Sequence, residues 1–327
     1  MRNELKMEAG THQPIQYCNK SFDTATENLK LLIQLLYLIP SAVLQSLVIY
    51  TIGWKNKKPA KNESFFTIFL VECTTGFILV LSSILFSRPM MYLPQACDYL
   101  LHYLRSHIRL LEFYCPFFRY LHALQILLQM LFIANRTSCV LWPLSYVSFW
   151  KKWLKLIIFI MAILPCFWVW TIVFSHKFII NVYGGIEIRF TNYFEWADDS
   201  LVFAVLRLVS VVFIGLTTLI TVIRMSQMKQ RIKESERKLS HVSVYLSICY
   251  FIPVITEIDN IFLNQGFSVN REAFYAFSIV FWDIQNIGST FVMLVTSASF
   301  RNSVFDFTVK KEKKKSKSLK IPRVSQF

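Results

Sequence analysis

Seven apolar stretches, each long enough to cross a bilayer, constrain the fold of this chain more than any other feature. They cover residues 29–52, 65–86, 113–135, 154–174, 201–223, 240–263 and 273–297. A hydrocarbon core about 30 Å thick takes roughly 20 helical residues to cross, and runs this long and continuous do not fit the strands of a membrane barrel. The sequence therefore predicts an all-α membrane protein, a bundle of seven transmembrane helices.

The distribution of lysine and arginine predicts how these helices are oriented. If the N-terminus is outside, the cytoplasmic segments carry 23 of the 35 Lys and Arg residues, against 9 in the outer segments. Basic residues are enriched in the cytoplasmic loops of membrane proteins, so we expect the N-terminus outside and the C-terminus in the cytoplasm. Topology then explains the net charge of +15, and nucleic acid is not an expected partner.

The ends of the chain add two polar segments to the transmembrane domain, which we place at residues 29–299. Residues 1–28 contain Pro14 and lack the apolar core of a signal peptide. They are predicted to be an extracellular segment, with the first span acting as its own insertion signal. Residues 310–327 are rich in lysine and are predicted to be a disordered cytoplasmic tail, which is either attracted to anionic membrane lipid or simply solvated.

Between the seventh span and this tail, residues 300–309 have an amphipathic pattern. Four apolar side chains fall on about one face of a helix: Phe300, Val304, Phe305 and Phe307. A helix with one apolar face beside a membrane span is typical of a segment that lies in the interface. We therefore predict a short juxtamembrane helix on the inner leaflet.

Two cysteines and one asparagine in the outer segments predict covalent modifications. Cys18 and Cys97 both face the oxidising side of the membrane in this topology. A disulfide between them, joining the N-terminal segment to the first outer loop, is the preferred pairing; the alternative is that both remain free thiols. Asn19 begins an Asn-Lys-Ser sequon and is a predicted glycosylation site.

The sequence has no motif for catalysis or for nucleotide or metal binding. GxSxG, HExxH, Walker and GxGxxG patterns are all missing. The six histidines form no spaced cluster with cysteines or carboxylates. We therefore expect no enzyme activity, no cofactor and no metal.

The most specific local motif follows the third span, at residues 135–146. Asn-Arg-Thr-Ser-Cys-Val-Leu-Trp-Pro-Leu-Ser-Tyr resembles the pattern D-R-Y-x-A-V-x-x-P-L-x-Y of rhodopsin-like receptors, with Arg, Val, Pro, Leu and Tyr in register. The resemblance implies a G-protein coupling site formed by Asn135, Arg136, Trp142, Pro143, Leu144 and Tyr146. The alternative is that Arg136 is one more cation at the inner face.

Three departures mark this chain as a divergent receptor. Asn135 replaces the acid of the pattern, the seventh span has no N-P-x-x-Y, and residues 175–200 contain no cysteine.

Further short motifs resemble one nematode chemoreceptor family, the serpentine receptor class gamma (Srg) proteins: Tyr37-Leu38-Ile39-Pro40, Ser64-Phe65-Phe66, Tyr92-Leu93-Pro94 with Cys97, Asn135-Arg136 with Trp150, and Arg301.

The Srg resemblance covers about residues 15–310 and implies a function. Members of this family are seven-helix, GPCR-like receptors for small chemical cues, expected in the plasma membrane of sensory neuron cilia and signalling through heterotrimeric G proteins. The resemblance therefore makes a small-molecule ligand and a heterotrimeric G protein the expected partners.

Two carboxylates inside the spans are candidates for a polar switch, because charge in the membrane interior is costly and seldom idle. Glu72 and Asp283 both fall near mid-depth of their helices. If they share the bundle interior they would repel each other, unless one is protonated or a cation bridges them. The alternative is that each is protonated, bonded to a nearby hydroxyl and purely structural.

A second polar group lies in the outer half of the bundle and predicts a ligand site. Its members are Arg119, His122, Arg207, Tyr275 and Trp282, with Trp196 at similar depth. A cationic, aromatic-lined cavity would suit a small amphiphile bearing a carboxylate. The alternative is that both arginines extend to the headgroups and the histidine is a satisfied interior residue. Glu257 and Asp259 could instead attract a cation, which leaves the charge of the ligand open.

Together these features predict a chemoreceptor that binds a small molecule in the outer half of the bundle. A polytopic transporter or channel is the main alternative, and it would predict helices broken by Gly and Pro and a polar path through the bundle. Pro40, Pro165 and Pro253 interrupt three spans, but the chain has only 8 glycines. A scaffold without any ligand is a third reading that the sequence leaves open.

Overall fold

The computed structural model of this chain describes residue 18 and residues 22–55, 64–182, 184–191, 199–227, 271–296 and 298–305. Among these residues, six helices are long and apolar enough to cross a membrane: Thr24–Trp54, Ser64–Tyr92, Arg109–Leu141, Pro143–Phe174, Leu201–Arg224 and Phe277–Val295. Each overlaps one predicted stretch, which confirms a helical, multi-pass bundle. The remaining stretch, 240–263, lies outside the described residues, so the seventh span and the orientation of the termini stay predictions.

The helices and strands follow one another along the chain in a simple order. They are α2 (Thr24–Tyr50), η1 (Thr51–Lys55), α4 (Ser64–Ser82), η2 (Ser83–Ser87), α5 (Arg88–Tyr92), α6 (Pro94–Ser106), α7 (Ile108–Leu141), α8 (Pro143–Ile163), α9 (Cys166–Phe174), β1 (Lys177–Val182), β2 (Gly185–Phe190), α10 (Asp199–Ser226), α12 (Arg271–Thr296) and α13 (Ala298–Phe305). Pro165 separates α8 from α9 within one membrane-length segment.

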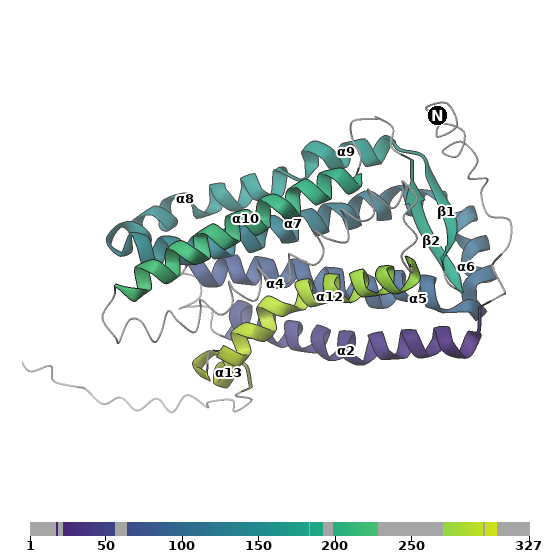
Figure 1. The fold of residues 1–327 in the computed structure, drawn as a ribbon, viewed down its shortest axis with the longest axis horizontal. Coiled ribbons are helices and arrows are strands. Elements are labelled where there is room, and N and C mark those ends of the chain that lie inside the picture. Colours follow the sequence, from purple (N-terminus) through teal and green to yellow (C-terminus); the bar gives the residue numbers. More distant parts are fainter. Residues whose placement is uncertain are drawn as a thin grey trace, which may run out of the picture.

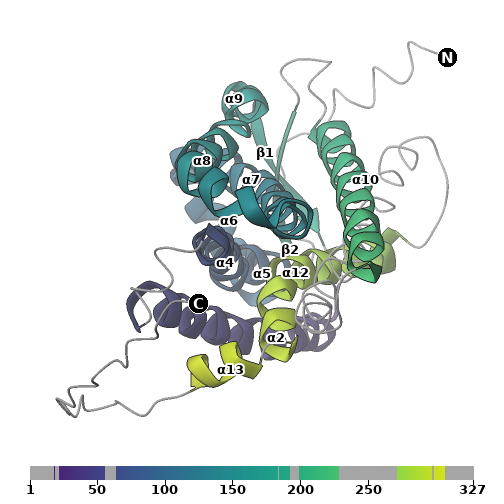
Figure 2. The same cartoon turned by 90° about the vertical axis from the view of Figure 1, so that its left-hand side faces the viewer.

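The long helices run side by side, and α7 lies in the middle of them. It packs against α4, α8, α9 and α10, as the view along the bundle shows (Figure 2). In the other view the β1–β2 hairpin and α6 lie at one end of the bundle, and α13 lies at the opposite end (Figure 1). We call these the hairpin end and the α13 end.

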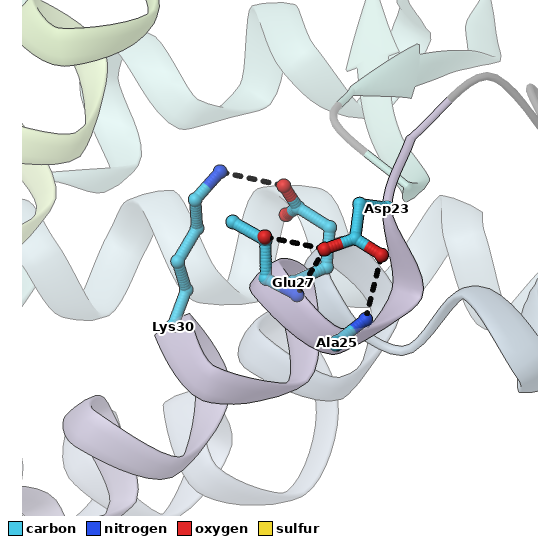
Figure 3. A network of polar contacts seen from close by, with 5 residues as sticks. Asp23, Ala25, Glu27 and Lys30 are labelled. Atoms are coloured by element: carbon cyan, nitrogen blue, oxygen red, sulfur yellow. Dashed lines mark hydrogen bonds and ion pairs between the residues drawn. The ribbon is translucent and has the colours of Figure 1, made fainter.

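The start of α2 shows how local chemistry sets a helix boundary. The Asp23 carboxylate accepts hydrogen bonds from the Thr26 hydroxyl at 2.6 Å and from the backbone N–H groups of Thr26 and Ala25 (Figure 3). These bonds satisfy donors that the first turn of a helix leaves without partners. They also lower the pKa of Asp23, first through the Thr26 side chain. One turn on, Glu27 pairs with Lys30 at 2.5 Å.

The hairpin end contains a strand pair that the helix-based prediction missed. β1 and β2 pair in antiparallel register from Lys177 opposite Phe190 to Val182 opposite Gly185. Buried Ile179 and Ile186 of the hairpin belong to one apolar cluster with Leu101, Leu104 and Cys97 of α6. The β-branched residues around Gly184-Gly185 are the sequence signal that would have indicated the hairpin.

A disulfide joins Cys18 to Cys97 at the same end, with the two Cα atoms 6.1 Å apart. Cys97 lies on the buried side of α6, and Cys18 packs against the same apolar cluster. The bridge therefore ties the residues before α2 to the α6–hairpin layer. Asn19, the predicted glycosylation site, lies outside the described residues.

The short helix α13 differs from the helix expected on the inner leaflet. Phe300 and Val304 are buried in the main apolar core instead of facing lipid, because aromatic rings of α4 lie against them. The Phe300 ring centroid lies 5.8 Å from that of Phe69. Phe305 is exposed, and Phe307 lies outside the described residues. Phe300 and Val304 of the predicted apolar face therefore dock α13 onto the bundle.

The contact between α4 and α12 depends on Gly76. A Cβ atom at this position would lie 2.8 Å from the Asn286 carbonyl oxygen and 3.3 Å from the Gln45 amide nitrogen. The Asn286 carbonyl is backbone and already accepts a hydrogen bond from Gln45 at 2.9 Å, so it cannot move away at low cost. Gly215 of α10 has nothing within 4 Å of the same hypothetical atom.

Replacing Gly76 by Ala should therefore destabilise the bundle, whereas Gly215→Ala should not. Overpacking of a close contact costs roughly 1–3 kcal/mol. We expect a lower thermal unfolding midpoint for purified Gly76→Ala and an unchanged or higher one for Gly215→Ala. Equal midpoints for the two variants would contradict the close approach of α4 to α12.

Candidate functional site

Three of the predicted ligand-site residues meet between α7, α10 and α12. The guanidinium carbon of Arg207 lies 4.6 Å from the ring centroid of Trp282, and the Trp282 ring lies 4.8 Å from that of His122. Arg207 is 1% exposed and His122 is 7% exposed. The alternative in which Arg207 extends to the headgroups is therefore wrong. We call His122, Arg207 and Trp282 the outer cluster.

Arg119 lies next to the outer cluster and has an acidic partner. Its guanidinium forms an ion pair with Asp199, at 3.2 Å, and lies 5.5 Å from the Phe203 ring centroid. Arg207 approaches the same ring at 5.9 Å. Both arginines thus lie near the ring of Phe203, which is fully buried. Asp199 and Phe203 were not among the predicted site residues.

The outer cluster contains buried polar atoms for which the described residues provide no hydrogen-bond partner. Within the described part of the chain, neither His122 Nε2 nor Trp282 Nε1 has a hydrogen-bond partner. Buried polar groups in folded proteins nearly always have one, so such a pair points to a ligand or water position. The side chains of Tyr275 and of Trp196, Glu257 and Asp259 lie outside the described residues.

Asp283 forms a buried ion pair that the sequence did not predict. Both of its carboxylate oxygens accept hydrogen bonds from Arg88 at 2.8 Å, and the Tyr37 hydroxyl donates to one of them at 2.6 Å. Arg88 is 5% exposed. The charge count placed Arg88 among the nine basic residues of the outer segments. This placement is wrong, because α5 continues the second span and carries Arg88 into the bundle.

Glu72 belongs to a separate group of hydrogen bonds deeper in the bundle. Its Oε1 atom accepts from Gln125 at 2.8 Å, from Gln129 at 3.2 Å and from Ser289 at 2.7 Å. Glu72 is 1% exposed, and its neighbours come from α7 and α12. The two carboxylates therefore do not share one site, because each has its own set of donors. We call this group the Glu72 node.

Asn135 at the α13 end holds two neighbouring segments. Its amide nitrogen donates to the Ser64 hydroxyl at 3.1 Å, and its oxygen accepts from the Tyr146 hydroxyl at 3.0 Å. The hydroxyls of Ser64 and Tyr146 are themselves 3.0 Å apart. A third bond, from Trp150 Nε1 to the Ser138 hydroxyl at 2.8 Å, fixes the start of α8 against α7.

The rest of the predicted coupling motif lies at the junction of α7 and α8. Trp142 ends α7, and Pro143 is the first residue of α8, where the missing N–H of proline costs nothing. Trp142 is 62% exposed and Leu144 is 100% exposed. Arg136 lies over the Phe65 ring, 3.2 Å from its centroid. The junction thus presents two large exposed apolar side chains, while Arg136 is held against α4.

Breaking the Arg88–Asp283 pair on one side should destabilise the protein more than removing both partners. Loss of one member of a buried ion pair leaves a buried charge and costs roughly 3–5 kcal/mol. We expect Asp283→Leu to lower the unfolding midpoint strongly, and Arg88→Met combined with Asp283→Leu to recover part of the loss. A double variant as unstable as the sum of its single variants would contradict the pairing.

Comparisons with known proteins identify the family of this chain. The family model for the Srg family chemoreceptors matches residues 31–304. Serpentine receptor class gamma-1 of Caenorhabditis elegans is 50% identical over 277 residues, covering 84% of this chain and 96% of that protein. Serpentine receptor class gamma-9 of the same species is 33% identical over 310 residues, with 94% and 92% covered. The resemblance seen in the sequence motifs is thereby confirmed, and this chain belongs to the Srg family of chemoreceptors.

Proposed function

We propose that this chain is a G-protein-coupled chemoreceptor that binds a small molecule at the outer cluster and couples to a heterotrimeric G protein at the α13 end. The observation that carries the ligand site is the pair of buried atoms, His122 Nε2 and Trp282 Nε1, that have no hydrogen-bond partner among the described residues. Membership of the Srg chemoreceptor family supports the same function.

The chemistry of the outer cluster favours a ligand that accepts hydrogen bonds. Trp282 Nε1 can only donate, and the Arg207 guanidinium is a donor and a cation. A buried donor left without a partner costs roughly 1–3 kcal/mol. A ligand whose acceptor atom reaches Trp282 would remove that cost, so part of its binding free energy would come from satisfying the site.

For this function, the receptor must lie in the membrane with its hairpin end outside the cell. The excess of basic residues in the opposite segments supports an extracellular N-terminus and a cytoplasmic C-terminus. The Cys18–Cys97 disulfide then lies in an oxidising compartment, and Asn19 is available for glycosylation. We place the receptor in the plasma membrane, in sensory neuron cilia as the family suggests.

The α13 end has the features of a coupling surface. Trp142 and Leu144 are exposed at the α7–α8 junction, where apolar side chains could contact a partner. Arg136 lies in the last two turns of the third span. Asn135, Ser64 and Tyr146 hold this junction by hydrogen bonds, so its geometry depends on how α4 and α7 are packed.

Two buried polar groups connect the proposed ligand and coupling sites. The Arg88–Asp283 pair lies next to Trp282 in the sequence of α12, and the Glu72 node joins α4 to α7 and α12. A ligand shifts a conformational equilibrium only through different affinities for its two states. A ligand that moves α12 through Trp282 would change the geometry of both groups, and both are therefore our candidates for the polar switch.

The ligand-site proposal predicts that removing the Trp282 N–H weakens ligand binding. Trp282→Phe keeps an aromatic ring and deletes the donor, and a lost hydrogen bond of about 1–1.5 kcal/mol lowers potency roughly tenfold. The measurement is the half-maximal concentration of an active compound found by screening small polar molecules on cells expressing the receptor. Trp170→Phe, at a half-exposed position of α9, is the matched control and should leave that concentration unchanged.

The coupling proposal predicts that Arg136→Ala abolishes G-protein activation while ligand binding persists. Nucleotide exchange on a purified heterotrimer, with the full-length receptor in lipid nanodiscs, should fall at least about tenfold, because the cation at the end of the third span is lost. Arg189→Ala removes an exposed arginine at the hairpin end and should not affect exchange. Normal exchange with Arg136→Ala would exclude this residue from coupling.

A further inference from the structure

The contact between Arg136 and Phe65 is unusually close. The guanidinium carbon lies 3.2 Å from the centroid of the phenyl ring, whereas Arg207 lies 4.6 Å from that of Trp282. A cation over the face of an aromatic ring is attracted by the negative charge of that face. Phe65 is the second residue of α4, so this contact joins α4 to the α13 end of α7.

Phe65 is held firmly and cannot follow the arginine. It is 5% exposed, and its ring centroid lies 5.1 Å from that of Phe132 and 6.0 Å from that of Phe69, with which it is stacked. Phe132 belongs to α7, one turn before Arg136. Because protein interiors are close-packed, the Phe65 ring stays in place. Any large movement of Arg136 towards a partner therefore breaks its contact with the ring.

The neighbouring Asn135 does not supply a charge that could replace the ring. It carries a neutral amide, and that amide is bonded to Ser64 and Tyr146. In the D-R-Y pattern this position is an acid, which can attract the arginine by charge. Here the residue at that position fixes the α4 and α8 segments instead, and the ring of Phe65 lies directly against the cation.

From this geometry we propose that Phe65 is a positioning residue that holds Arg136 against α4 in the silent state of the receptor. The proposal rests on the function proposed above. When Arg136 extends towards a G protein, it loses the ring contact, so the contact stabilises only the state that does not couple. Removing the negative face of the ring shifts the equilibrium towards the coupling state and raises signalling without ligand.

The test measures basal nucleotide exchange, which needs no ligand. Full-length receptor variants are reconstituted in phosphatidylcholine nanodiscs with a purified heterotrimeric G protein, and uptake of labelled GTPγS is followed. Phe65→Leu should raise the basal rate about 2- to 30-fold, the range that corresponds to the strength of a cation–ring contact. Phe65→Tyr keeps the ring face and should give the wild-type rate.

Two further variants separate this role from a loss of packing. Ile68→Ala removes a fully buried side chain from the same helix and apolar cluster but keeps the Phe65 ring, and it should leave the basal rate unchanged. Pentafluorophenylalanine at position 65 keeps the ring and withdraws the negative charge from its face, so it should raise the rate as Leu does. This variant also tests the proposal if Phe65→Leu fails to fold.

The outcomes distinguish failure of this proposal from failure of the proposed function. If Arg136→Ala abolishes exchange but neither change at Phe65 raises it, the receptor couples and the role of Phe65 is wrong. A rise of equal size with Ile68→Ala would overturn the proposal as well, since general loosening would then explain it. If the wild-type receptor drives no exchange and Arg136→Ala changes nothing, the proposed function fails and this inference falls with it.

Discussion

The structure depends on one constraint, which is that polar side chains inside an apolar bundle must find partners within the protein. Glu72 meets this constraint most fully, since Gln125, Gln129 and Ser289 all donate to its Oε1 atom. These donors come from two different helices, so the position of each helix relative to α4 is fixed by one carboxyl group. Gly76, one turn along α4, allows the close approach to α12 that these bonds require.

The same constraint bears on the outer cluster as a candidate ligand site. Asp283 satisfies Arg88 and Tyr37, and Asn135 satisfies Ser64 and Tyr146. In the outer cluster, His122 Nε2 and Trp282 Nε1 are buried without a described partner, and their two rings lie 4.8 Å apart. One certain donor, Trp282 Nε1, beside a second unpartnered ring nitrogen fits a receptor whose ligand completes the site.

Sequence reasoning predicted the features that depend on composition along one helix and missed those that depend on contacts between helices. Apolar length located the six described spans, and the motif at residues 135–146 located the α7–α8 junction. The grouping of His122, Arg207 and Trp282 followed from their similar depth. Depth along a helix could not predict the partners of Asp283. The sequence placed Arg88 in a loop, whereas in the structure α5 continues the second span and carries Arg88 into the bundle. The aromatic partner of Arg136 could not be predicted from the sequence either, since no rule of residue spacing links Phe65 to Arg136.

A receptor that works in this way must have its hairpin end outside the cell and its α13 end in the cytosol, which in turn requires an odd number of spans. The most direct test places one epitope tag before Met1 and another after Phe327, and stains intact and permeabilised cells. We expect the first tag to be labelled on intact cells and the second only after permeabilisation. Labelling of both tags under the same condition would contradict the seven-span arrangement and the receptor mechanism built on it.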